Sequence, residues 1–112
     1  MSVSYEGIGH MAVTFLAGTA KEGQLCKLSV VGKSDACSSA EAFCGYVEKT
    51  DANLAAVQLE GFVTVPYTGT APTRGYSKLS SNGTGGVKVD SAGKEYLVAA
   101  IDYEKLLVTF KL

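Results

Sequence analysis

Cysteine, histidine, proline and tryptophan are scarce in this sequence. Its 112 residues include three cysteines, one histidine, two prolines and no tryptophan. Three cysteines are too few, and odd in number, for a framework of disulfides. Cys26, Cys37 and Cys44 form no Cys-x-x-Cys pair, so no metal site is predicted. We expect three reduced, partly buried thiols in a protein made in a cytosol.

An excess of charge of one sign is also absent. Ten basic and eleven acidic residues are mixed along the chain and give a formal charge of −1. Because no basic patch could neutralise phosphates, we expect no nucleic-acid partner. No apolar run approaches the roughly 20 residues of a membrane-spanning helix, so we expect no membrane partner. The first residues lack the basic and apolar regions of a secretory signal.

Groups that could carry catalysis are few. The single histidine, His10, lies in an N-terminal stretch without periodicity, where a histidine is usually just solvated. A nucleophile at Cys37 or Cys44 would need His10 as its base, and neither cysteine lies in a recognisable signature. The acidic residues are scattered, and the sequence leaves their separation in space open. We predict that the protein is not an enzyme and holds no cofactor, and we keep a small cysteine enzyme as a third hypothesis.

The sequence does contain short apolar runs separated by turn residues. Hydrophobic residues make up 46% of the chain, and many of its thirteen glycines lie between the runs. This pattern predicts short strands joined by tight turns. Residues 36–42 also fit one short helical turn, and no repeat with a period of about 20 to 50 residues is visible. The strand candidates are residues 12–16, 24–31, 43–48, 54–67, 76–79, 87–90, 96–101 and 106–112.

We predict an all-β fold, a small single-domain β-barrel or sandwich of about seven or eight short strands. Residues 12–112 would form this domain, and residues 1–11 a flexible N-terminal arm. The longest strand-like stretch, residues 54–67, nearly alternates apolar and polar side chains. Gly61 interrupts it, so we expect a bend between two strands there. The predicted buried face holds Val57, Leu59, Val63 and Val65, and the outer face holds Gln58, Glu60 and Thr64.

The order of several segments resembles a known family. Gly23-Gln24-Leu25 opens a strand, Gly45-Tyr46-Val47 precedes a polar turn, and residues 56–66 read AVQLEGFVTVP. Gly75-Tyr76-Ser77, a glycine-rich hairpin and a closing LLVTFKL follow. This order is similar to the small head-decoration or head-fibre proteins of tailed phages and prophages. The chain departs from that family at Gly75-Tyr76-Ser77, where a Gly-Asp form is usual, and at residues 100–102, which replace a more glycine-rich strand.

The resemblance implies a virion protein that binds the exterior of the assembled capsid and stabilises it. Its partner would be the major capsid protein, and it would form a homo-oligomer, with a trimer favoured. It would be made in the bacterial host cytoplasm and would need no active site or cofactor. The N-terminal arm would then become ordered on the capsid, with Tyr5, Ile8 and His10 as contacts.

A carbohydrate- or cell-surface-binding β-module is the alternative. The sequence has six tyrosines, and exposed aromatic rings are common in binding surfaces. Tyr67 and Tyr76 are the candidate platform residues in this interpretation.

Overall fold

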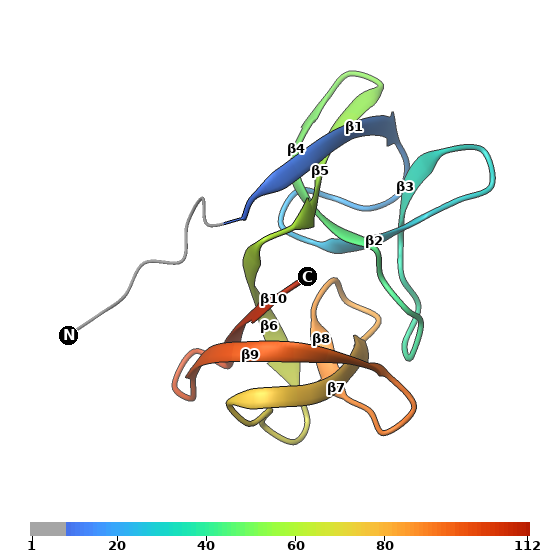
Figure 1. The fold of residues 1–112 in the computed structure, drawn as a ribbon. Coiled ribbons are helices and arrows are strands. Elements are labelled where there is room, and N and C mark those ends of the chain that lie inside the picture. Colours follow the sequence, from blue (N-terminus) through green and yellow to red (C-terminus); the bar gives the residue numbers. More distant parts are fainter. Residues whose placement is uncertain (1–8) are drawn as a thin grey trace.

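Strands make up all of the regular structure in residues 9–112, which are the residues that the computed structural model describes (Figure 1). The all-β fold class is therefore confirmed, with ten strands in place of the seven or eight expected. Tyr5 and Ile8 lie outside the described residues. The strands are β1 (Met11–Ala17), β2 (Leu25–Leu28), β3 (Lys33–Ala36), β4 (Gly45–Asp51), β5 (Leu54–Glu60), β6 (Phe62–Thr68), β7 (Gly75–Ser81), β8 (Val87–Val89), β9 (Lys94–Asp102) and β10 (Leu107–Lys111).

These strands form two small closed barrels. Barrel 1 contains β1 to β5 in the order β1-β3-β2-β4-β5, and barrel 2 contains β6 to β10 in the order β10-β6-β8-β7-β9. Barrel 1 closes because β1 pairs with β5, and barrel 2 closes because β9 pairs with β10. Figure 1 shows barrel 1 (blue to green) above barrel 2 (yellow to red), with the C-terminus between them.

The two barrels share one topology. In each, the first strand runs parallel to the third and antiparallel to the fifth. The second strand pairs with the third and the fourth, and the fourth pairs with the fifth. The register is also repeated, because Val13 faces Val57 in barrel 1 as Val63 faces Phe110 in barrel 2. The second half of the chain therefore repeats the architecture of the first.

The repeat extends to an irregularity in the pairing. In β4 the register with β5 shifts between Val47 and Lys49, and in β9 the register with β10 shifts between Val98 and Ala100. Lys49 and Ala100 correspond in this comparison, and they differ in size, charge and polarity. Strand pairing depends on which side chains face inward, and not on residue identity. This is why the sequence itself shows no repeat.

Two parts of the strand prediction were wrong. Residues 24–31 do not form one strand, because β2 ends at Leu28 and the chain turns through residues 29–32 before β3 begins at Lys33. Ser29 holds this turn, since its N–H donates to the Lys33 carbonyl and its hydroxyl accepts from the Lys33 N–H. Residues 36–42 form no helix, because Ala36 ends β3 and the Ala40 N–H and the Glu41 carbonyl bond to Ser81 of β7.

Barrel 2 is built around three aromatic rings. The centroid of Phe43 lies 5.0 Å from that of Tyr96 and 5.8 Å from that of Phe110, and Tyr96 and Phe110 are 5.2 Å apart. Phe43 comes from the segment between β3 and β4, so the first half of the chain supplies a ring to the second barrel. Leu25 and Cys37 join the same buried cluster. The first half of the chain therefore contributes to the core of barrel 2.

Backbone hydrogen bonds also join the barrels. The Ala40 N–H donates to the Ser81 carbonyl (2.8 Å), and the Ser81 N–H donates to the Glu41 carbonyl (3.0 Å). The Leu25 N–H donates to the Gly85 carbonyl at 2.9 Å. These bonds hold barrel 1 against the β7–β8 hairpin of barrel 2.

Gly61 links the barrels and bends the long strand-like stretch, as predicted. Its φ is +102°, in the region that favours glycine, and it separates β5 from β6. Gln58 lies outside the core of barrel 1, as its predicted place on the outer face implies, but it is buried there and only 6% exposed. Its Nε2 donates to the carbonyls of Glu60 (3.0 Å) and Phe62 (3.2 Å) on either side of the bend. The buried amide therefore stabilises the bend by satisfying these two carbonyls.

Candidate functional site

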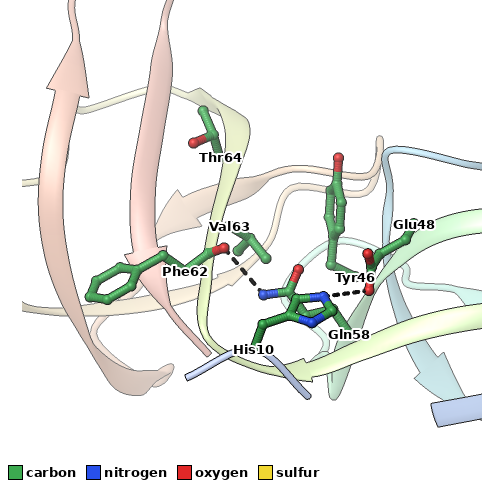
Figure 2. A pocket seen from close by; sticks show the side chains of 7 residues that line it. All are labelled: His10, Tyr46, Glu48, Gln58, Phe62, Val63 and Thr64. Atoms are coloured by element: carbon green, nitrogen blue, oxygen red, sulfur yellow. Dashed lines mark hydrogen bonds and ion pairs between the residues drawn. The ribbon is translucent and has the colours of Figure 1, made fainter. Parts of the chain in front are cut away.

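An open hollow of about 500 Å³ lies where barrel 1 meets the beginning of barrel 2. β4 and β5 contribute to it from barrel 1, β6 contributes from barrel 2, and the residue before β1 completes it. Figure 2 shows the side chains that line the hollow, which are His10, Tyr46, Glu48, Gln58, Phe62, Val63 and Thr64.

His10 is the one predicted contact residue that falls within the described chain, and it is held in this hollow. Its Nε2 lies 2.8 Å from the Oε1 of Glu48 (Figure 2), and each side chain is about one third exposed, at 37% and 33%. Glu48 is the bulged residue of β4, and a bulge redirects the side chain that it carries. His10 therefore anchors the start of the described chain to barrel 1.

The cysteine–histidine pairs considered from the sequence are not formed. The imidazole of His10 is bonded to Glu48. The thiol of Cys44 is hydrogen-bonded with that of Cys26, and the thiol of Cys37 donates to the carbonyl of Ala42 at 3.8 Å. Neither cysteine has His10 as a base.

The polar side chains of Thr64 and Gln58 in the hollow are also engaged. The Thr64 hydroxyl bonds to that of Thr109 at 2.7 Å, and the amide nitrogen of Gln58 bonds two backbone carbonyls. Among the described residues that line the hollow, the His10–Glu48 pair and the Tyr46 phenol present polar groups at a partly exposed surface. This arrangement suits the binding of a polar group of a partner.

A second hollow of about 300 Å³ lies on barrel 2 in a corresponding place. In this hollow Leu97 of β9 pairs with Lys111 of β10. The corresponding pair in the first hollow is Tyr46 of β4 with Gln58 of β5. Tyr76 is 71% exposed beside it. The second hollow is lined by Tyr76, Lys94, Glu95, Tyr96, Leu97, Lys111 and Leu112.

The two tyrosines proposed as a carbohydrate platform lie in different environments. Tyr67 is 5% exposed and belongs to the core of barrel 2, so the prediction that it is a surface platform was wrong. It shares the inward face of β6 with Val63 and Val65, as the period of two along a strand requires. Tyr76 is exposed and remains available for such a role.

Barrel 1 carries an exposed group of aliphatic side chains at the end where the β2–β3 turn lies. Val30 is fully exposed and Val31 is 64% exposed. The N–H of Leu16 donates to the Gly32 carbonyl, and Leu16 pairs with Leu54, so these two leucines lie beside the turn. We name this group the apolar tip; it consists of Leu16, Leu28, Val30, Val31 and Leu54.

Sequence reasoning missed both the hollow and the apolar tip. The hollow requires residues from β4, β5 and β6 to meet, which only the tertiary structure reveals. The tip had a signal in the sequence, since Val30-Val31-Gly32 places two β-branched residues directly before a turn glycine. That signal was hidden because residues 24–31 were interpreted as one strand.

Comparisons with protein-family models, with curated proteins and with solved structures found no match. Within residues 9–112, no helix is long and apolar enough to cross a membrane. The same part of the chain contains no group of three or more His, Cys, Asp or Glu side chains placed to hold a metal ion. Function is therefore inferred from the surface of the fold and from the resemblance of residues 56–66.

Proposed function

We propose that this protein is a phage or prophage capsid decoration protein that docks on the outside of the assembled head through the apolar tip. The observation that carries the proposal is the full exposure of Val30, together with the exposure of Val31, at the end of the β2–β3 hairpin. Exposed aliphatic side chains that gather in one place commonly mark a protein-binding surface. The resemblance of residues 56–66 to head-decoration proteins supplies the kind of partner, which is the major capsid protein.

Burial of the tip would provide a substantial driving force. Fully burying one valine or leucine side chain contributes about 1.5–3 kcal/mol relative to leaving it exposed. Part of this is offset by the loss of rotational and translational freedom on docking. Because the decoration protein would bind the assembled lattice and not the free subunit, this binding free energy would stabilise the shell by mass action.

The N-terminal arm is a second, separate contact in this proposal. β1 runs from the hollow, where His10 is bonded to Glu48, to the apolar tip, where Leu16 meets the β2–β3 turn. The arm and the tip therefore emerge at opposite ends of β1. Their contributions to capsid binding can be separated by changing one end at a time.

The test is binding of the purified protein to expanded, undecorated heads of the cognate phage, measured by co-sedimentation. We expect the double variant V30D/V31D to bind at least tenfold more weakly, because two charges would be placed in the interface. Tyr103→Asp is the matched control, since Tyr103 is 66% exposed on barrel 2, and its binding should be unchanged. Failure of the unmodified protein to bind at micromolar concentration would refute the proposal.

The arm is tested by deleting residues 1–8. The deletion stops before His10 and Met11, because His10 bonds to Glu48 and Met11 pairs with Glu60 in the β1–β5 ladder. We expect weaker capsid binding with an unchanged circular dichroism spectrum. The mass in solution adds a further check, since the resemblance favours a trimer.

Carbohydrate binding at the second hollow is the alternative function. Tyr76 presents a ring that is 71% exposed, and the ammonium group of Lys94 lies 5.5 Å from the centroid of the Tyr96 ring within the same hollow. Exposed aromatic rings beside polar side chains suit the stacking of a sugar. Binding on a carbohydrate array that is lost in Tyr76→Ala and kept in Tyr103→Ala would favour this function over capsid docking.

A further inference from the structure

Two of the three cysteines lie side by side on neighbouring segments. Cys26 is in β2, and Cys44 directly precedes β4, whose first residue, Gly45, pairs with Cys26. The Cys44 N–H donates to the Cys26 carbonyl at 2.8 Å. Each of the two thiols is close enough to shift the pKa of the other. Because the backbones of Cys44 and Cys26 are hydrogen-bonded as those of neighbouring strands are, their Cα atoms lie close enough for a disulfide to span.

The two thiols differ in access to solvent. Cys44 is exposed, whereas Cys26 is only 1% exposed. A reagent in solution therefore reaches Cys44 first, and Cys26 is positioned to react only with a group already attached to Cys44. This is the arrangement of an attacking thiol with a resolving thiol behind it.

The surroundings of Cys44 favour its thiolate. A hydrogen bond from the Cys26 thiol is the largest cause and lowers the pKa of Cys44 from its ordinary value of 9.0 to about 7. Burial acts in the opposite direction, and backbone N–H groups of Cys44 and Leu28 lower the pKa further. The thiolate is the form that attacks disulfides.

The third cysteine is placed differently. Burial and the nearby carboxylate of Glu41 raise the pKa of Cys37 to about 11, so it stays a thiol at neutral pH. Its sulfur donates to the carbonyl of Ala42. Cys37 therefore serves as an internal control for the other two.

We infer that Cys44 is a thiol–disulfide exchange site for small disulfides of the glutathione class, and that Cys26 is its resolving thiol. In the first step the Cys44 thiolate attacks one sulfur of oxidised glutathione, a mixed disulfide forms, and one glutathione thiolate leaves. In the second step the Cys26 sulfur attacks the Cys44 sulfur, the bond between Cys44 and glutathione breaks, and the proton of Cys26 passes to the glutathione thiolate that leaves. The two protein thiols are oxidised to one disulfide, and one oxidised glutathione is reduced to two glutathione molecules.

The disulfide would have a structural consequence. It would tie β2 to the end of the segment of residues 37–44, which carries Phe43 into the core of barrel 2. A Cys26–Cys44 disulfide would close a loop of residues 26–44, and this closure restricts the unfolded chain more than the folded one. We expect the Tm of the oxidised protein to be higher by roughly 5 °C. The inference is independent of capsid docking, since neither cysteine belongs to the apolar tip.

The test is to incubate the full-length protein with oxidised glutathione and to map the products by peptide mass spectrometry. The unmodified protein should form a Cys26–Cys44 disulfide, and Cys26→Ser should stop at glutathione attached to Cys44. Cys44→Ser should react at least tenfold more slowly. Cys37→Ser, the matched control, should behave like the unmodified protein.

A second measurement uses no variant and so avoids any effect of substitution on folding. The rate at which iodoacetamide alkylates Cys44 in the unmodified protein should rise with pH around a midpoint near 7. A midpoint near the ordinary thiol value of 9.0 would overturn the inference, as would attachment of glutathione to Cys37 or undiminished reaction in Cys44→Ser.

Discussion

Barrel 2 encloses aromatic rings, whereas barrel 1, which has the same topology, encloses small side chains. The core of barrel 2 includes Phe43, Tyr96 and Phe110. The core of barrel 1 has alanine, cysteine and valine as its fully buried members, which are Ala20, Cys26, Val47, Ala55 and Val57. One pattern of strand pairing is therefore compatible with two very different cores.

A pair of corresponding valines shows the same difference at a single position. Val13 is 37% exposed in β1, whereas Val63, its counterpart in β6, is 4% exposed. Val63 is buried in the cluster that includes Phe43, Leu25 and Cys37, and these residues come from the first half of the chain. The first half of the chain therefore contributes apolar side chains to the core of barrel 2, while other apolar side chains of the first half, such as Val13, are exposed at the surface. Because barrel 2 has the larger buried core, we expect it to carry more of the stability, whereas barrel 1 presents the apolar tip.

The largest expected effect comes from truncating corresponding core residues. Phe110→Ala should lower the free energy of unfolding by about 3–5 kcal/mol, because it removes a ring from the aromatic cluster and leaves a cavity. Val57→Ala, at the corresponding position of barrel 1, should cost about 2 kcal/mol. Urea unfolding followed by circular dichroism measures both. Equal losses would contradict the view that barrel 2 carries more of the stability.

An intermediate effect is expected at the junction of the barrels. Gly61→Ala should cost about 1–3 kcal/mol, because φ is +102° and the new Cβ would lie 2.9 Å from Gln58 Nε2 and 3.1 Å from the Cα of His10. Gly69→Ala is the matched control, since its φ is also positive, at +74°, and no heavy atom lies within 4 Å of the added Cβ. It should cost about 1 kcal/mol. The same loss in both variants would show that the junction is not tightly packed.

The smallest effect concerns one carboxylate in each half of the chain. The pKa of Glu41 is lowered most by a hydrogen bond from the Ser38 N–H and next by one from Lys27. The pKa of Asp90 is lowered most by a hydrogen bond from the Ala92 N–H and next by one from Ser80. A lowered pKa in the folded state adds stability that is complete above the unfolded pKa and disappears as the pH falls through the folded pKa.

The free energy of unfolding should therefore decrease as the pH falls below the ordinary pKa values, which are 4.5 for Glu41 and 3.8 for Asp90. In Glu41→Gln and in Asp90→Asn, the free energy of unfolding should each time depend less steeply on pH. Unfolding by urea between about pH 6 and about pH 2 measures this change. If the free energy of unfolding of either variant changes with pH as steeply as that of the unmodified protein, the corresponding carboxylate does not contribute to the pH dependence.

Much of the fold was predictable, because strand periodicity is a local property. The alternation correctly predicted that Val63 and Val65 of β6 are buried, whereas Tyr67, which was proposed as an exposed platform residue, is buried beside them. Gly61 correctly predicted the bend between β5 and β6. The burial of Gln58 on the outer face was not predicted, because its amide donates to carbonyls at the bend, and a pattern of alternating polarity does not reveal such a partner.

The candidate sites were less predictable, because their parts are distant in the sequence. His10 was predicted to be a contact residue from the sequence, but its bond with Glu48 joins two residues that come together only when β1 and β4 pair with opposite edges of β5. The thiols of Cys26 and Cys44 likewise meet only through the pairing of β2 with β4.

The sequence by itself determined the all-β class, the short strands and the bend at Gly61, since each depends on residues close together in the chain. Only the tertiary structure decided that the strands close into two barrels of one topology and that Phe43 crosses from the first half to the second. Closure depends on pairing between distant strands, and two different sets of side chains satisfy the same pairing.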